Sequence, residues 1–352
     1  MQAATPVPRA RLAETPPAAR GGTAGARVPA GALRALASLG LLGVLASALL
    51  LAGGAAGEPS RFVPARSGGW PGWLAGPLAG LHLGLPGERF QTLMLIMCGG
   101  YALVLAGART LPARALVAGI VAAHVILVLG PPLLSQDIFG YLAYGRMGAL
   151  HGLDPYTHFP SEAPADPVFQ FLGWPFQHSP YGPLFTLGSY AVAPLGPAAG
   201  VWVFKALSAL ASLAAIALIA AAAGSLGRSR RWAAAFVGLN PVLLALAVGG
   251  AHNDTLVLLV LALALLLSTG VGSLGSHYRG AAVTLAAGVG VKVTAALLLP
   301  FLALAPPRPR ERVGVLTSAA LGLLALAVIG LIGFGTHAIG FLGAVGEQQQ
   351  LV

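Results

Sequence analysis

Long apolar runs separated by short polar segments form the main pattern of the chain. They cover 33–53, about 90–108, 114–133, 198–224, 232–248, 255–269, 281–304 and 313–335. As helices, runs of about 20 residues cross the roughly 30 Å of a bilayer core, whereas those of about 15 residues reach only ~23 Å. We therefore expect some helices to end inside the protein. The stretch 183–195 is broken by prolines and too short to span alone, so whether it is re-entrant or crosses stays open.

The composition agrees with an all-α, polytopic transmembrane protein. Hydrophobic residues make up 57% of the chain and charged residues 9%, against roughly 25% charged in a soluble domain. So few charges cannot cover the surface of a water-soluble globule. The single Cys98 excludes a disulfide framework. The net charge of +10 lies in short segments between apolar runs, which indicates contact with anionic membrane lipid and no nucleic-acid partner.

The placement of charge predicts domain organisation and orientation. Residues 1–32, rich in Pro, Ala, Gly and Arg, are predicted to be a disordered cytoplasmic tail, and 33–352 a transmembrane domain with an external loop at 134–182. We interpret 281–304 as a hairpin that turns near Lys292. A single crossing there would place three arginines outside, against the positive-inside rule: Arg308, Arg310 and Arg312.

The external loop opens with the segment 135–148, which we expect to be an amphipathic helix at the membrane surface. Ser135 is its expected N-cap, and Tyr141 and Tyr144 share one face with Asp137. At a helix N-terminus the dipole keeps the carboxylate of Asp137 ionised, as a general base for a sugar hydroxyl requires. The alternative is that Asp137 only supports the start of the helix.

Aromatic and polar side chains recur along the rest of this loop, at Asp154, Tyr156, Trp174, His178 and Tyr181. Such a mixture is typical of the lining of a carbohydrate site. An aromatic belt at the membrane interface explains the Trp and Tyr residues equally well. Both interpretations stay open.

A second polar cluster comprises His252, Asn253 and Asp254, and ends the apolar segment that continues from Asn240. Three polar residues at the end of an otherwise apolar hairpin are expensive in a membrane unless they are used. A functional site and a plain solvated turn are both compatible with the pattern.

Lys292 lies inside an apolar run, where a lysine costs roughly 2.5–3.5 kcal/mol on insertion scales. It must snorkel, pair with a carboxylate or hold an anion, and phosphate is the natural anion there. The hairpin would bring Lys292 to the same side of the membrane as Asp137 and Asp254. Those two acids alone do not define a metal site. Lys205 lies close enough to a helix end to snorkel.

Several short motifs occur in order between about 130 and 350. They are Ser-Gln-Asp-Ile-Phe-Gly-Tyr from Ser135, Tyr-Gly-Arg-Met-Gly from Tyr144, Asp-Pro-Tyr from Asp154, Ser-Pro-Tyr-Gly-Pro from Ser179, Asn-Pro at Asn240, Gly-Gly-Ala-His-Asn-Asp from Gly249 and Gly-Val-Lys from Gly290. Together they resemble the actinobacterial polyprenol-phosphate-mannose-dependent α-1,6-mannosyltransferases, which are GT-C fold glycosyltransferases.

The resemblance implies an inverting hexosyltransferase of GT-C type in the cytoplasmic membrane. It would move mannose from polyprenyl-phosphate-mannose to a mannan or lipoglycan hydroxyl on the outer face, elongating an α-1,6-mannan. No cofactor is implied, because the lipid-linked sugar is a substrate. Asp137 matches the catalytic base, and Lys292 and Arg146 are implied contacts of the donor phosphate.

The further candidate substrate-binding residues are Gln136, Tyr141, Tyr144, Asp154, Tyr156, His178, Tyr181, Asn240, His252, Asn253 and Asp254. Family members are usually longer, so we expect this chain to lack C-terminal spans. Two other classes remain as alternatives. A multi-span transporter or lipid flippase would explain broken helices and an intramembrane lysine, and a non-catalytic scaffold would make the polar residues dispensable.

Overall fold

The computed structural model describes residues 29–57, 71–84, 86–270 and 277–348, and every regular element within these ranges is a helix. The predicted all-α, polytopic architecture is thus confirmed. The described part contains four helices long and apolar enough to cross a membrane, at Ala30–Gly57, Glu88–Gly107, Pro183–Ser225 and Pro309–His337. Shorter apolar helices cover Ala113–Leu129, Asp254–Thr269 and Val293–Leu304. Residues 1–28 of the predicted tail lie outside the described residues, and helix α1 begins at Ala30.

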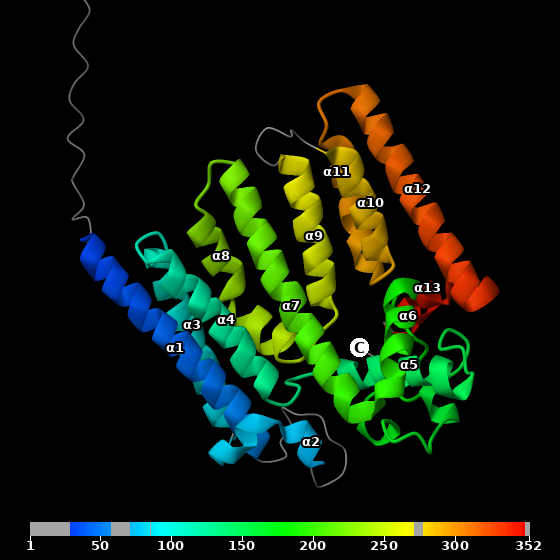
Figure 1. Ribbon diagram of the computed structural model, residues 1–352, viewed down its shortest axis with the longest axis horizontal. Coiled ribbons are helices and arrows are strands. Elements are labelled where there is room, and N and C mark those ends of the chain that lie inside the picture. The colour runs from blue at the N-terminus through cyan, green and yellow to red at the C-terminus, as the bar shows by residue number, and fades with distance from the viewer. Residues whose placement is uncertain (1–28, 58–70, 85, 271–276, 349–352) are drawn as a thin grey trace, which may run out of the picture.

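The long helices lie side by side in a row (Figure 1). Helices α1 (Ala30–Gly57), α3 (Gly87–Gly107) and α4 (Ala113–Leu129) form one side, α7 (Gly196–Ser225) and α9 (Asp254–Thr269) the middle, and α10 (Tyr278–Val289) and α12 (Pro309–Phe334) the other. Glycines let α1 and α3 approach closely, because a Cβ at Gly40 would collide with the carbonyl of Gly100. Such contacts are typical of helices that pack within membranes.

Arginines gather at one end of the row. The connections from α3 to α4, from α7 to α8 (Arg230–Gly238) and from α11 (Leu299–Leu304) to α12 lie at the top of Figure 1, whereas α5 (Asp137–His151) lies at the opposite end. The arginines in or beside these connections are Arg109, Arg114, Arg228, Arg230, Arg231, Arg308, Arg310 and Arg312. The sequence placed most arginines on one side of the membrane, and in the structure the arginines of these connections lie at one end of the helical bundle.

The predicted hairpin within 281–304 is confirmed. Helix α10 ends at Val289, the chain turns through 290–292, and it returns as the 3-10 helix Val293–Leu298 and helix α11 (Leu299–Leu304). Both returning segments pack against α10. Lys292 lies in extended conformation at the start of the returning segment, and it lines the same cavity as Asp137 of α5.

The run 232–248, predicted as one crossing, is broken. Helix α8 (Arg230–Gly238) stops before Asn240, and a π-helical segment (Leu243–Val248) follows. The side-chain oxygen of Asn240 accepts hydrogen bonds from the backbone N–H groups of Val242 and Leu243, at 2.9 and 3.2 Å. Asn240 thus satisfies backbone donors at the break, where Pro241 cannot continue the N–H pattern.

Helix α5 forms where the sequence predicts it, but it is not an amphipathic helix at the surface. Nearly every residue from Ile138 to Met147 is buried. It packs against α6 (Pro183–Val192), which turns through a 3-10 segment (Ala193–Leu195) into α7. Consecutive buried residues cover every face of α5, so the expected division into a wet and a lipid face is wrong. The remaining helices are short: α2 (Gly72–Ala75) and α13 (Gly340–Gln348).

Candidate active site

Asp137 is the first residue of α5, and a short turn fixes it there. Its N–H donates to the hydroxyl oxygen of Ser135 at 3.0 Å. Gln136 takes the N-cap position that was expected of Ser135. The carboxylate of Asp137 therefore lies at the positive end of the α5 dipole, where a negative charge is stabilised by about 0.3–1 kcal/mol.

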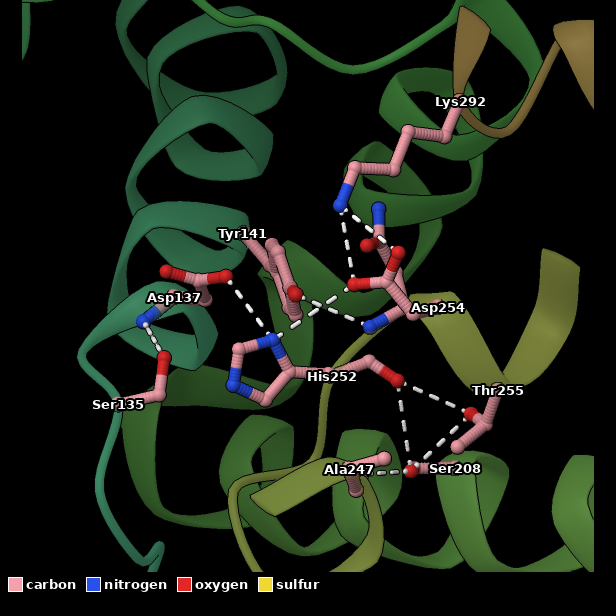
Figure 2. A network of polar contacts seen from close by, with 10 residues as sticks. Ser135, Asp137, Tyr141, Ser208, Ala247, His252, Asp254, Thr255 and Lys292 are labelled. Atoms are coloured by element: carbon pink, nitrogen blue, oxygen red, sulfur yellow. Dashed lines mark hydrogen bonds and ion pairs between the residues drawn. The ribbon is translucent and has the colours of Figure 1, made fainter. Parts of the chain in front are cut away.

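The turn between the π-helical segment and α9 carries the second polar cluster. Ala251 adopts a left-handed conformation with φ of 56°, which is uncommon for a residue with a Cβ. The N–H of Asn253 donates to the hydroxyl of buried Tyr141 at 3.0 Å. Tyr141 thus ties α5 to the turn, and the imidazole of His252 lies between the carboxylates of Asp137 and Asp254 (Figure 2).

Four charged side chains alternate in sign across this site. Nδ1 of His252 lies 3.2 Å from Oδ2 of Asp137 and 3.7 Å from Oδ2 of Asp254. Nζ of Lys292 donates to both carboxylate oxygens of Asp254 at 2.9 Å. Figure 2 shows this series running from α5 through the turn to the hairpin.

Between two carboxylates, His252 becomes a cation. Burial by itself lowers the pKa of His252, but hydrogen bonds and charge from Asp137 and Asp254 outweigh burial and raise the pKa to about 9. The imidazole therefore carries a proton at pH 7. Its Nδ1–H points to Oδ2 of Asp137 at 3.2 Å. Nε2 of His252 is buried without a hydrogen-bond partner among the described residues.

A cavity of about 260 Å³ brings Asp137 and Lys292 together. Tyr144, Trp174 and Tyr181 line it, together with Gly140, Leu172, Gln177, Pro180, Val293 and Thr294. This volume is close to the lower limit of roughly 300–1,000 Å³ for small-molecule sites. Aromatic walls with an acid on one side and an ammonium on the other suit a sugar ring next to an anionic group.

Arg146, which was expected to contact a donor phosphate, does not line this cavity. Its guanidinium pairs with Asp166 at 2.9 Å and donates to the carbonyl of Ala193. His151 lies 2.7 Å from the same carboxylate. Burial works against ionisation of Asp166, but hydrogen bonds from His151 and Arg146 outweigh it and lower its pKa. The ion pair between Arg146 and Asp166 anchors the loop 152–182 to α5.

Four other expected binding residues have contacts elsewhere. Asp154 accepts from the N–H of Tyr156 and lies 3.0 Å from Nδ1 of His337. The hydroxyl of Tyr156 donates to the carbonyl of Tyr181 behind the cavity wall. His178 packs on the ring of Phe159, and Asn240 lies at the α8 break. Of the remaining candidates, Gln136 packs against Gly173, and Asn253 is buried beside His252.

Six residues of the cavity lining were not among the sequence candidates, and two of these six are polar, Gln177 and Thr294. Each lies within two residues of a candidate that was named, His178 and Lys292. Their closeness in sequence to a named candidate was the signal that could have identified them. Where the chain turns at a cavity-lining residue, its neighbours in sequence can line the same cavity.

The fold and the site define a polytopic membrane protein whose charged cavity lies at the end opposite its basic connections. The chain belongs to the alpha-(1->6)-mannopyranosyltransferase family, whose N-terminal domain model matches residues 39–308. The resemblance that the motifs indicated is therefore confirmed.

Curated relatives share this family name. An alpha-(1->6)-mannopyranosyltransferase A of Corynebacterium glutamicum is 29% identical over 182 residues, 51% of this chain and 36% of the relative. The protein of that name from Mycobacterium tuberculosis is 30% identical over 216 residues, 58% of this chain and 40% of the relative. The chain thus matches well under half the length of these relatives. No solved structure matches it significantly.

Proposed function

We propose that the protein transfers mannose from polyprenyl-phosphate-mannose to a hydroxyl of a mannan or lipoglycan, at the outer face of the cytoplasmic membrane. One observation carries this proposal: Asp137 and Lys292, 155 positions apart in the sequence, line one cavity. The names of the relatives support the sugar, and the basic end opposite the cavity supports an external site.

The chemistry follows from the two sides of the cavity. Asp137 takes the proton of the acceptor hydroxyl, whose oxygen attacks C1 of mannose from the face opposite the phosphate. The bond between C1 and the phosphate oxygen breaks, and polyprenyl phosphate leaves with the electron pair. Configuration at C1 inverts. General-base assistance of this kind contributes roughly 10²–10⁴-fold.

Lys292 stabilises the departing phosphate. Two of its three ammonium hydrogens can serve the two oxygens of Asp254, and the third is left for a ligand in the cavity. The leaving group gains negative charge as the bond breaks, so an ammonium next to it binds the transition state more tightly than the ground state. Tyr144 and Trp174 give flat apolar surfaces for the sugar ring.

The test measures mannosyl transfer from labelled polyprenyl-phosphate-mannose in membranes. We expect Asp137→Asn and Lys292→Met each to lower the rate at least 100-fold. Glu88→Gln is the matched control, because it also exchanges a carboxylate for an amide but on an exposed residue at the start of α3. Full rates in both cavity variants would overturn the site. If the wild-type protein transfers no sugar but moves lipid or solute across vesicle membranes, the result would favour the alternative function as a transporter or lipid flippase.

A further inference from the structure

Lys205 is a lysine whose side chain the proposed chemistry does not use. It lies in α7 and is 0% exposed, so the expected snorkelling to the membrane surface is wrong. Among the described residues, no carboxylate lies within ion-pair distance of its ammonium. Its Nζ donates instead to two backbone carbonyls, of Gly249 at 3.1 Å and Pro131 at 3.3 Å. Buried ionisable residues in membrane helices generally have a role, because their burial is costly.

The two carbonyls belong to the two chain segments that deliver the charged groups. Pro131 follows the end of α4 and precedes Asp137 by six residues. Gly249 follows the π-helical segment and precedes His252 by three. The carbonyl of Gly249 also accepts from the N–H of Leu133 at 3.0 Å. Lys205 thus joins both segments at one point, through hydrogen bonds from its Nζ to carbonyls that follow the C-terminal ends of two helical elements.

The backbone directly beyond these contacts is strained. Leu134 has φ of 64° and Ala251 has φ of 56°. Non-glycine residues keep such conformations only where the surroundings hold them in place. Lys205 holds the carbonyl three residues before Leu134 and the one two residues before Ala251. Removing its hydrogen bonds would let both segments relax toward ordinary conformations.

Ser208, one turn further along α7, holds the same turn from its other side. Its hydroxyl donates to the carbonyl of Ala247 at 3.1 Å. The hydroxyl of Thr255 lies 3.1 Å from Ser208 Oγ and 3.0 Å from the carbonyl of His252. Figure 2 shows this lower set of contacts beneath the imidazole of His252. One face of α7 therefore binds the turn at both ends.

We propose that Lys205 is a positioning residue that sets the separation between Asp137 and His252 by tying the 131–135 and 247–255 segments to α7. This inference rests on the proposed function for its kinetic consequence only. Its structural consequence, the contact between the imidazole and Asp137, is independent of which reaction the cavity performs.

The test compares wild type with Lys205→Met, which keeps the length of the side chain and removes its donors. Ser212→Ala is the matched control: it removes a buried polar partner on the same helix, the hydroxyl 2.9 Å from Nε2 of His124. For Lys205→Met we expect kcat to fall at least tenfold, with KM for the donor unchanged within twofold. Ser212→Ala should keep the wild-type kcat. An unchanged kcat in Lys205→Met would overturn the proposal.

A second readout needs no activity. The titration of His252 is followed by NMR of 15N-histidine-labelled protein in nanodiscs and assigned with His252→Gln. The groups that face this imidazole are Asp137, Asp254 and the hydroxyl-bearing Tyr141. We expect the midpoint to fall by at least one pH unit in Lys205→Met and not in Ser212→Ala.

The two readouts separate the two proposals. A shifted titration in a protein whose wild type transfers no mannose would keep the positioning role and reject the proposed function. If the wild type transfers mannose but the His252 titration is unshifted in Lys205→Met, the proposed function stands and the positioning role is rejected. If Lys205→Met does not fold, Ser208→Ala takes its place, with an expected loss of about threefold in kcat and a downward shift in the same midpoint. No shift there would reject the positioning role.

Discussion

The protonated state of His252 predicts how stability depends on pH. Its pKa of about 9 lies about 2.5 above the ordinary 6.5, because Asp137 and Asp254 outweigh the effect of burial. Each pKa unit corresponds to about 1.36 kcal/mol, so the net shift corresponds to roughly 3 kcal/mol of stabilisation of the folded protein. The side chain of Asp254 is 46% exposed, and solvent screening reduces the expected contribution to ~2 kcal/mol.

The sign follows from the raised pKa. The folded protein holds the proton of His252 more tightly than the unfolded chain does. The stabilisation is therefore complete below about pH 6.5 and is lost as pH rises through about 9. The free energy of unfolding, measured by SDS titration in mixed micelles, should fall by about 2 kcal/mol between pH 6.5 and 9.5.

Two variants make this measurement specific. His252→Gln removes the titrating group, so its unfolding free energy should lack this step. His158→Gln, at a partly exposed loop histidine hydrogen-bonded to Thr157, should keep the step. Equal pH slopes in wild type and His252→Gln would show that the carboxylates do not hold a proton on His252, and the alternating-charge description of the site would fail.

Two further predictions concern the frame around the cavity. In Gly182→Ala a new Cβ would lie 2.5 Å from the backbone of Gly290 at the hairpin turn, so we expect a loss of about 1–3 kcal/mol in SDS unfolding. Gly188→Ala, with open space around its Cβ position, should be neutral. In Arg146→Gln the buried carboxylate of Asp166 loses its guanidinium partner. We expect the free energy of unfolding to fall by about 1–3 kcal/mol, seen as a lower thermal unfolding temperature. KM for the donor should stay unchanged. A raised KM would restore Arg146 as a phosphate contact.

The sequence predicted the hairpin because charge was decisive there. Without a turn near Lys292, three arginines would lie on the external side of the membrane, and an isolated lysine would stand in the middle of an apolar span. A turn at Lys292 removes both problems, and the structure has that turn. The proximity of Asp137 and Lys292 followed from their assignment to the same side of the membrane. At one end of a small helical bundle, two charged side chains that avoid lipid are confined to a small volume.

Partner choice was beyond the sequence. Arg146 had several acids within reach of an unknown loop path, and pairing with Asp166 depends on how 152–182 folds back on α5. The burial of α5 likewise depends on α6, whose contact no periodicity within α5 reveals. Lys205 was judged by its distance from a helix end, whereas its partners are backbone carbonyls that carry no sequence signal.

The exposure of the four charged groups argues that this network is more than a structural fastening. A purely structural ion-pair network at a helix junction gains most when its members shield one another from solvent. Here the side chains of Asp137, Lys292 and Asp254 remain 20%, 29% and 46% exposed, and the first two open into one cavity. His252, the member with 16% exposure, lies 3.2 Å from one carboxylate oxygen of Asp137, Oδ2. As the least exposed member, His252 links the two carboxylates, and Asp137 and Lys292 face the cavity where a substrate would lie.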